Sequence, residues 1–315
     1  MYHIIVNPNA RSGRGRKNWE TIRHILDDQN VEYAVHFSKK RGDTVQYTRE
    51  LYERYSPLNL IVLGGDGTLN EVVQGISSFE NVTISTIPIG SSNDLALALG
   101  ISFNPEEAIL HLLNKPTVLY MDLGTVHYEN SLTREGSMVI PDRRFLVSTG
   151  VGYDAAVCQE ALASGIKNLL NRLRLGKLSY LLICLKQLLA FKYSECELTF
   201  EDRDETIKID KLVFMGGMNN KYEGGGFMFA PEASNHDGLL DLCVVSDLSK
   251  TAILRLLPTA LHGEHLGHDG INLYRTNSYT VRTSSPVWVH TDGEVDTKAD
   301  VISVSCEKEL IKIVY

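Results

Sequence analysis

The chain has 315 residues, 43% of them hydrophobic and 22% charged, which is a globular composition at a length where one core usually gives way to two domains. Lys and Arg number 31 against 39 Asp and Glu, so the net charge of −8 provides no positive field for nucleic acid, and we expect no nucleic-acid partner. Five cysteines without a CxxC pair, and a most apolar stretch (Tyr180 to Phe191) that Lys186 interrupts, indicate a cytoplasmic protein with neither a disulfide framework nor a membrane span.

The first third of the chain alternates short β-type runs with segments of helical spacing. The predicted strands are His3–Val6, Tyr33–Phe37, Leu58–Leu63 and Thr83–Ile87, and the predicted helices are Lys17–Asp28, Asp43–Tyr55, Leu69–Ile76 and Pro105–Leu113. Such alternation specifies a mostly parallel sheet covered on both faces, here an αβ domain over residues 1–123. Ligands of such sheets bind at the carboxyl ends of the strands, so we expect the chemistry in the strand-to-helix turns.

From about Gly124 the sequence becomes strand-rich and indicates a β-rich, antiparallel, sandwich-like second domain over residues 124–305. The predicted strands are Phe145–Thr149, Cys196–Phe200, Lys211–Met215, Leu239–Val245, Tyr279–Arg282, Val287–His290, Val301–Cys306 and Leu310–Val314. Within this domain, Ile166 to Lys192 has leucines at helical spacing in two pieces separated by Gly176. We therefore expect a helical insertion at 166–192.

A glycine-rich turn, Gly64-Gly65-Asp66-Gly67-Thr68, directly follows the buried run that ends at Leu63. Its glycines leave backbone amides open to close approach by a phosphate at the start of a helix. Asp66 would repel that phosphate unless a divalent cation lay between them, so we interpret it as a Mg²⁺-linked carboxylate of a nucleotide site. Thr68 and Glu71 also match a capping box, and the alternative is that they only start the helix.

Two further turns are expected at the same edge of the sheet. Gly90-Ser91-Ser92-Asn93-Asp94 follows the fourth predicted strand, and Ser91 and Asp94 repeat the cap spacing. The first strand leads into a small-residue loop, Asn7 to Lys17, whose basic side chains either neutralise a triphosphate or are simply solvated. No GxxxxGK[ST] element occurs, which excludes a P-loop enzyme.

Two acids separated by glycine, Asp292-Gly293-Glu294, follow the strand Val287–His290. The glycine places an adaptable backbone between two carboxylates aimed at one region, although a hairpin turn with solvent-facing acids has the same pattern. Phosphoryl transfer depends mainly on positioning and charge neutralisation, so an Asp with an ordinary pKa of about 4 would suffice to orient a hydroxyl and accept its proton.

Together these motifs resemble the diacylglycerol kinase catalytic-domain family, the soluble bacterial lipid kinases related to sphingosine and ceramide kinases. The resemblance rests on GGDGTLNEV at Gly64–Val72, NPNARSG at Asn7–Gly13 and GSSNDLA at Gly90–Ala96. It continues through Met121–Gly124, Pro231–Asp241 and Asp292–Glu294, and so covers nearly the whole chain. The GGDGT motif alone is shared with NAD kinases and, loosely, phosphofructokinases, whereas the ordered set is far more specific.

The resemblance implies an ATP site in a cleft between the two domains, with the chain end at about 306–315 returning to the first. It implies that Asp292 and Glu294 are the catalytic pair, and that an acidic network surrounds the nucleotide and its Mg²⁺: Asp66, Asp94 and Asp122. It implies nucleotide contacts from Asn7, Ser38, Gly64, Gly65, Asp66, Gly67, Thr68, Leu69, Asn70 and Ser91. A second, structural Mg²⁺ site is implied at Asp237, Ser234 and the Leu239 carbonyl.

The function favoured by these observations is ATP- and Mg²⁺-dependent phosphorylation of a hydroxyl of diacylglycerol, giving phosphatidic acid. The alternatives are a kinase of another lipid alcohol (a sphingoid base or ceramide), a soluble-substrate GGDGT kinase such as NAD kinase, and a non-catalytic lipid-binding regulator. Acids retained around a phosphate site count against the regulator, because they would only repel phosphate there.

A membrane lipid substrate calls for a peripheral membrane surface, and residues 166–192 are the candidate for it. The segment holds six basic residues and no acids in a chain that is net negative. Its leucine stripes are either an interfacial surface or ordinary core faces. We expect a cytoplasmic, peripherally membrane-associated protein, and a homodimer is left open.

Overall fold

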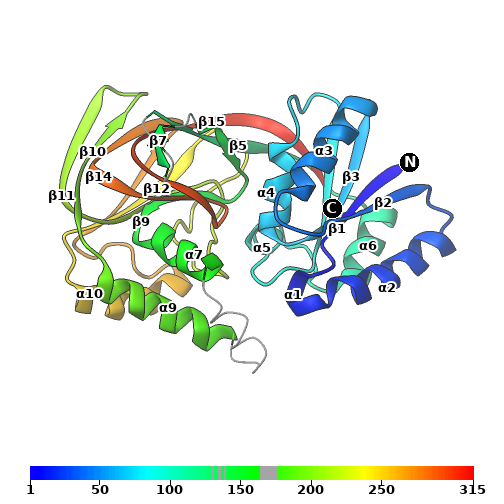
Figure 1. Ribbon diagram of the computed structural model, residues 1–315, viewed down its shortest axis with the longest axis horizontal. Coiled ribbons are helices and arrows are strands. Elements are labelled where there is room, and N and C mark those ends of the chain that lie inside the picture. Colours follow the sequence, from blue (N-terminus) through cyan, green and yellow to red (C-terminus); the bar gives the residue numbers. More distant parts are fainter. Residues whose placement is uncertain (130, 134–135, 138–139, 164–175) are drawn as a thin grey trace.

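Two domains lie side by side and are joined by long strands (Figure 1). The computed structural model describes the chain except for residues 130, 134–135, 138–139 and 164–175. β5 (Val118–Tyr128) runs through the expected boundary near residue 123. β15 (Glu294–Val314) pairs antiparallel with β14 (Ser278–Thr291) of the second domain, and near its end it pairs parallel with β4 (Val82–Pro88) of the first. Backbone hydrogen bonds of β15 therefore connect the two domains.

The first domain is an αβ layer structure, as predicted. Its strands lie parallel in the order β4, β3 (Leu58–Gly64), β1 (Tyr2–Val6) and β2 (Tyr33–Phe37). The helices between them are α1 (Ala10–Gly13), α2 (Gly15–Asp28), α3 (Asp43–Arg54), α4 (Asp66–Gln74), α5 (Asp94–Leu99) and α6 (Pro105–Asn114). All the elements predicted for this domain are present, with ends that differ by a few residues.

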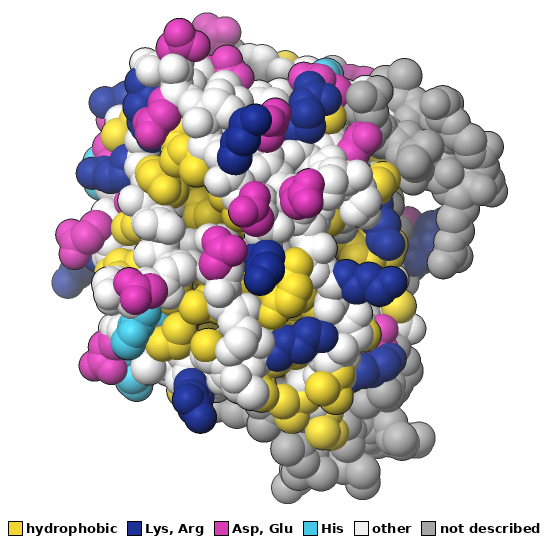
Figure 2. All heavy atoms as spheres, turned by 90° about the vertical axis from the view of Figure 1, so that its left-hand side faces the viewer, with side chains coloured by type: hydrophobic (Ala, Val, Ile, Leu, Met, Phe, Trp, Pro, Cys, Tyr) yellow, Lys and Arg dark blue, Asp and Glu magenta, His cyan; other side chains and the backbone are white. Residues whose placement is uncertain are grey.

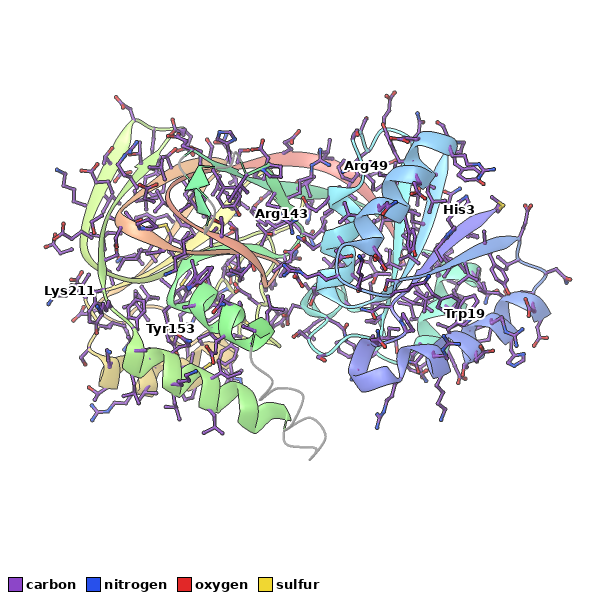
Figure 3. The ribbon with its side chains drawn as sticks, viewed as in Figure 1. His3, Trp19, Arg49, Arg143, Tyr153 and Lys211 are labelled. Carbon is purple, nitrogen blue, oxygen red and sulfur yellow. The ribbon has the colours of Figure 1, made fainter. Side chains whose placement is uncertain are left out.

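Both faces of this parallel sheet are buried. Ile4 and Val6 of β1 pack into one core together with α2 and α6, whereas Ile5 between them packs into a second core with α3 and α4. Trp19 of α2, labelled in Figure 3, packs edge-on against Phe37 of β2. The alternation follows from the two-residue period of a strand, and it leaves the carboxyl ends of the strands as the open edge.

The second domain is β-rich and sandwich-like, and its strands pair antiparallel. Its elements are β6 (Ser131–Thr133), β7 (Gly136–Ser137), β8 (Arg143–Phe145), β9 (Ser148–Gly152), β10 (Ser194–Phe200), β11 (Glu205–Met218), β12 (Leu240–Ser246) and β13 (Ile271–Thr276), together with β14 and β15. Fully buried Phe145 and Phe200 belong to its core.

Two pairs of predicted strands are single strands in the structure. Tyr279–Arg282 and Val287–His290 both belong to β14, and the last two predicted strands both belong to β15. The β14–β15 register shifts between Arg282 and Val287, and the β15–β5 register shifts between Glu307 and Ile311. These irregularities interrupt the alternation of side chains without ending the strand, so the pattern reads as two strands.

Helices cover the lower side of the second domain in Figure 1. They are α7 (Tyr153–Ala163), α9 (Gly176–Ala190), α10 (Lys250–Leu256) and the 3-10 helix η1 (Leu257–His262). α9 is the second piece of the expected helical insertion, and the first piece falls largely within residues 164–175, outside the described residues. Among the described helices, none is long and apolar enough to cross a membrane.

Candidate active site

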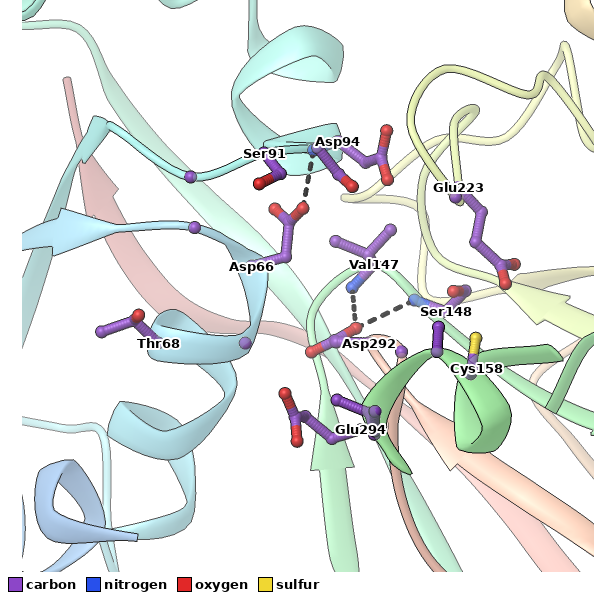
Figure 4. Close-up of a pocket in the computed structure, with 18 of the residues that line it drawn as sticks. Asp66, Thr68, Ser91, Asp94, Val147, Ser148, Cys158, Glu223, Asp292 and Glu294 are labelled. Carbon is purple, nitrogen blue, oxygen red and sulfur yellow. Dashed lines mark hydrogen bonds between the residues drawn. The ribbon is translucent and has the colours of Figure 1, made fainter. Parts of the chain in front are cut away.

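A cavity of about 640 Å³ opens between the two domains, and Figure 4 shows its polar part. The first domain contributes its strand-to-helix turns, including Asp66 and Ser91. The second domain contributes the start of β9, the turn at Asp292 and a largely apolar wall. The cavity therefore lies at the sheet edge where ligands of αβ domains bind.

The glycine-rich turn after β3 is locked to the next strand-to-helix turn by Asp66. The Asp66 carboxylate accepts a hydrogen bond from the backbone N–H of Asp94 at 2.8 Å (Figure 4) and another from that of Leu95 at 3.2 Å, both in the first turn of α5. A Cβ on Gly90 would lie 2.4 Å from the Cα of Gly65, so these glycines let the two turns touch. The glycines thus serve contact between turns as well as access to a phosphate.

Glu71 does not cap its own helix, so the capping-box interpretation of Thr68 and Glu71 is wrong. The N-cap of α4 is Gly65, with no side-chain cap. Glu71 instead accepts hydrogen bonds from the backbone N–H groups of Gly42 (2.8 Å) and Thr44 (3.2 Å), where α3 begins. The Thr68 hydroxyl accepts a hydrogen bond from Asn7 Nδ2 at 3.3 Å, which links the first and third strand ends.

Asp94 reaches from the first domain to a glycine loop of the second. Its carboxylate accepts hydrogen bonds from the backbone N–H groups of Gly225 (3.0 Å to Oδ2) and Gly226 (2.9 Å to Oδ1). Burial, and then the neighbouring Asp66 carboxylate, raise the pKa of Asp94 to about 7, and burial also raises the pKa of Asp66. Two close, buried carboxylates at a phosphate-suited turn are a donor set that fits Mg²⁺, which prefers oxygen ligands.

The carboxylate of Asp292 is surrounded by hydrogen-bond donors. Its carboxylate accepts bonds from the backbone N–H groups of Leu146 (2.9 Å), Val147 (2.8 Å) and Ser148 (3.1 Å), and from Asn70 Nδ2 (2.9 Å). Its own backbone lies in the left-handed region (φ 51°). Burial raises the pKa of Asp292 to about 6 against the effect of these donors, so the pKa is not the ordinary value expected from the sequence.

Glu294 faces the glycine-rich turn across the domain boundary. A Cβ on Gly67 would lie 2.7 Å from Glu294 Oε1, and Glu294 Oε2 pairs with Arg41 Nη2 at 2.7 Å. Asp292 and Glu294 both line the cavity, so the alternative of a hairpin with solvent-facing acids does not describe this turn.

Most of the expected nucleotide contacts line the cavity, and three do not. Asn7, Ser38, Gly65, Asp66, Gly67, Thr68 and Ser91 are on its wall. Leu69 belongs to the hydrophobic core, Gly64 ends β3, and Asn70 is a fully buried partner of Asp292. The same wall carries cations that could meet a triphosphate: Arg11, Lys39, Lys40 and Arg41. The last three follow β2, and the sequence analysis did not single them out.

Asp122 lies away from the cavity, in contrast to its expected place near the nucleotide. It is fully buried in β5, where its carboxylate accepts hydrogen bonds from the backbone N–H groups of Gly238 (2.6 Å) and Glu309 (2.7 Å). Its own N–H donates to the carbonyl of Asn235. Asp122 therefore holds the 235–238 turn against the irregular part of β15.

The expected structural Mg²⁺ site has its key carboxylate already engaged. Asp237 Oδ1 accepts a hydrogen bond from the Leu239 N–H at 3.0 Å, and Oδ2 pairs with the guanidinium of Arg275. Ser234 Oγ lies 3.3 Å from His236 Nδ1. A guanidinium stands where the cation would be needed, so these residues as arranged do not fit Mg²⁺.

A cluster that the sequence analysis missed borders the apolar wall. His290 Nε2 lies 3.1 Å from both Asp154 Oδ2 and Glu223 Oε1, and the imidazole is fully buried. Burial alone would lower the pKa of His290, but the two carboxylates outweigh it and raise the pKa well above 6.5. Gly150 pairs with His290 in the sheet, and a Cβ there would lie 2.0 Å from Asp154 Oδ2, so the cluster requires a glycine at this position. The glycine alone does not identify the cluster in the sequence.

Comparison with known proteins agrees with this two-domain architecture. Residues 1–126 match the diacylglycerol kinase catalytic domain, and residues 147–315 match the YegS C-terminal NAD kinase beta sandwich-like domain. A diacylglycerol kinase of Bacillus subtilis (strain 168) is 28% identical over 297 residues, covering 92% of this chain and 88% of that protein. One from Staphylococcus saprophyticus is 24% identical, covering 94% and 89%. A crystal structure of a diacylglycerol kinase from Bacillus anthracis shares the fold, with a TM-score of 0.69 at 20% identity over 100% of this chain and 96% of that one.

Proposed function

Because the chain belongs to the diacylglycerol kinase catalytic-domain family, we propose that it transfers the γ-phosphate of ATP to a hydroxyl of a membrane lipid. Diacylglycerol, which would become phosphatidic acid, is the first acceptor to test. One observation carries the proposal: a single cavity has a wall suited to phosphate, the carboxylate of Asp292 and an apolar wall. A soluble nucleotide and a lipid alcohol would meet there.

The first-domain wall suits the nucleotide. The N-terminus of α4 and the small residues of the glycine-rich turn present backbone N–H groups to the phosphates, and the cations after β2 supply opposite charge. Asp66 and Asp94 would hold Mg²⁺, which when bound neutralises charge on the transferred phosphoryl group. Asp66 also fixes the spacing of the two turns through α5.

Asp292 suits the acceptor hydroxyl. Three backbone N–H groups and Asn70 orient its carboxylate and stabilise the ionised form, while burial raises its pKa to about 6. A proton taken from the acceptor hydroxyl would replace one of these four hydrogen bonds. Glu294, held by Arg41 against the glycine-rich turn, would keep the Asp292 turn in register with the phosphates.

The second-domain wall suits an acyl chain. It is formed by apolar side chains from α7, β11, the loop after it and η1: Val157, Ala161, Leu162, Phe214, Phe227, Phe229 and Leu257. Leu162 is 44% exposed, so the apolar wall reaches the molecular surface. A chain bound here could remain continuous with a lipid layer outside.

The surface around this opening supports docking to an anionic phospholipid layer. Exposed leucines lie on α9, α10 and η1, namely Leu182, Leu189, Leu254 and Leu261. Lys250 Nζ donates to the Leu189 carbonyl at 2.8 Å, so α9 and α10 meet there, and Lys192 and Arg255 are exposed nearby in the chain. Figure 2 views the second-domain end of the molecule, and hydrophobic and basic side chains gather in the lower part of that face. Apolar insertion and attraction to anionic lipid would act together.

The test is phosphorylation of defined lipids. Purified protein is incubated with γ-labelled ATP, Mg²⁺ and detergent micelles containing dioleoylglycerol, and the label is followed into phosphatidic acid; a parallel reaction contains NAD in place of lipid. We expect label in the lipid only. Label in NAD alone, or ATP binding without transfer to any lipid in a total extract, would overturn the proposal.

A further inference from the structure

The Asp154–His290–Glu223 cluster lies where the polar and apolar walls of the cavity meet. Asp154 lies in the first turn of α7, Glu223 follows β11, and His290 is near the end of β14. Both carboxylates line the cavity, while the imidazole is fully buried behind them. In the view of Figure 4, Glu223 lies on the opposite side of Asp292 from Thr68 of the glycine-rich turn. The cluster therefore belongs to the second-domain side of the cavity, where it adjoins the apolar wall, and the Glu223 charge also reaches Asp94.

The tautomer of His290 argues against a metal at this cluster. The backbone N–H of Gly293 donates to His290 Nδ1 at 3.2 Å, so Nδ1 acts as an acceptor in this arrangement, and the bond opposes the second protonation that the two carboxylates favour. The imidazole hydrogen is then on Nε2, where it points at the two carboxylates. A metal ion would need the Nε2 lone pair, which this tautomer does not offer. The cluster is better described as two hydrogen-bond acceptors held by one donor.

The carboxylates have acceptor capacity left over. A single Nε2–H serves Asp154 Oδ2 and Glu223 Oε1, and the Ala155 N–H serves Asp154 Oδ1 at 2.7 Å. An ionised carboxylate has about four lone-pair sites. A hydroxyl or an ammonium group can fill the free sites by donating a hydrogen bond, and an ionised carboxylate also attracts positive charge.

The adjoining wall offers little that donates. Its side chains are mainly apolar, and the Tyr153 hydroxyl is already used by the Cys184 carbonyl at 2.8 Å. Burial raises the pKa of the Cys158 thiol to about 12, so it stays a neutral, weak donor. An ester oxygen, which only accepts, finds poor partners here, whereas an amine or hydroxyl finds two carboxylates.

We propose that Asp154, Glu223 and His290 bind a hydrogen-bond-donating group of the acceptor, an ammonium or a hydroxyl, beside the hydroxyl that is phosphorylated. This inference rests on the proposed lipid kinase function and specifies its substrate class. The favoured acceptors are single-chain lipids with an amino-alcohol or diol head. Diacylglycerol is a poorer one, because its second head-group oxygen is an ester.

The kinetic test compares acceptors in identical micelles. Wild-type protein is assayed with dioleoylglycerol, mono-oleoylglycerol and a single-chain 2-amino-1,3-diol lipid. We expect kcat/KM for the last two to exceed that for dioleoylglycerol by about tenfold or more, the effect of one charge-assisted hydrogen bond. Glu223→Gln should reduce this ratio about tenfold. Glu195→Gln, the same change at an exposed position on β10, should leave the ratio unchanged.

A binding measurement separates this inference from the kinase proposal. Titration calorimetry without ATP follows the amino-diol lipid in micelles, and Glu223→Gln should weaken its binding about tenfold. Weakened binding with no transfer to any acceptor would overturn the kinase proposal and leave the subsite standing. Transfer to dioleoylglycerol with an acceptor ratio and amino-diol affinity that Glu223→Gln does not change would overturn the subsite alone.

Discussion

The two walls of the cavity are assembled in different ways. The first-domain wall comes from turns that follow β1, β2, β3 and β4, and a parallel sheet brings those turns to one edge whatever their sequence. In the second-domain wall, Asp154 and Glu223 line the cavity beside apolar side chains and are held by His290 behind them. These three residues come from separate elements that are brought together because β9 pairs with both β11 and β14. Local motifs therefore describe the first wall, whereas the second depends on long-range pairing.

The largest effect is expected at Asp292, which joins the walls. Asp292→Asn removes the carboxylate that would take the proton, so kcat should fall by about 10²–10⁴-fold with little change in ATP affinity. Its amide nitrogen would also face two of the four N–H donors, so the stability of the folded variant is measured alongside. Single-turnover kinetics and nucleotide titration measure the two quantities. Asp210→Asn, on the exposed face of β11, is the matched control. Loss of ATP binding with a normal rate at saturation would move Asp292 to the nucleotide wall.

A change at Asp66 should disrupt the first wall alone. Asp66→Asn leaves one of the two α5 N–H groups facing an amide nitrogen, which costs about 1–3 kcal/mol, and it removes a charge proposed to hold Mg²⁺. We expect affinity for Mg²⁺-ATP to fall at least about tenfold, while micelle binding is kept. Asp28→Asn, exposed at the end of α2, is the control. Turnover within about twofold of wild type at limiting ATP would show that Asp66 has no such role.

This difference between the walls explains what could be predicted from sequence. The parallel sheet, its helices and the turns bearing Asp66 and Ser91 follow from hydrophobic period and glycine position, because each is a local property. Glu71 was misread because its true partners, at the start of α3, are distant in sequence. The role of Asp122 and the His290 cluster depend on sheet register and bulges, which hydrophobic period does not specify.

The pH dependence of activity should report Asp292 at the junction. Only its ionised form accepts a proton, and its pKa is raised to about 6, so kcat/KM should fall about tenfold per unit below pH 6. The free energy of unfolding changes with pH in the opposite direction at this residue. A raised carboxyl pKa stabilises the folded state at low pH, and this stabilisation is lost as the pH rises through 6. Activity is measured from pH 4.5 to 8, with unfolding followed over the same range. If kcat/KM falls only over the pH range in which the protein unfolds, the fall in activity does not report the ionisation of Asp292.

The smallest effect should come from the lipid-facing surface beyond the second wall. Leu189 is 79% exposed at the end of α9, so inserting it into a lipid layer gains part of the roughly 1.5–3 kcal/mol that full burial of a leucine provides. Leu189→Gln should therefore weaken binding to anionic vesicles by about fivefold, measured by sedimentation at low and high salt.

Leu110→Gln, on α6 of the first domain, where the leucine is 39% exposed, is the matched control and should bind like the wild type. Because the ATP wall is distant from α9 in the chain and lies in the other domain, Leu189→Gln should leave ATP affinity unchanged. Equal weakening by both leucine changes would mean that vesicle binding reflects exposed apolar area in general, and the membrane-facing side of the second domain would then have to be sought elsewhere.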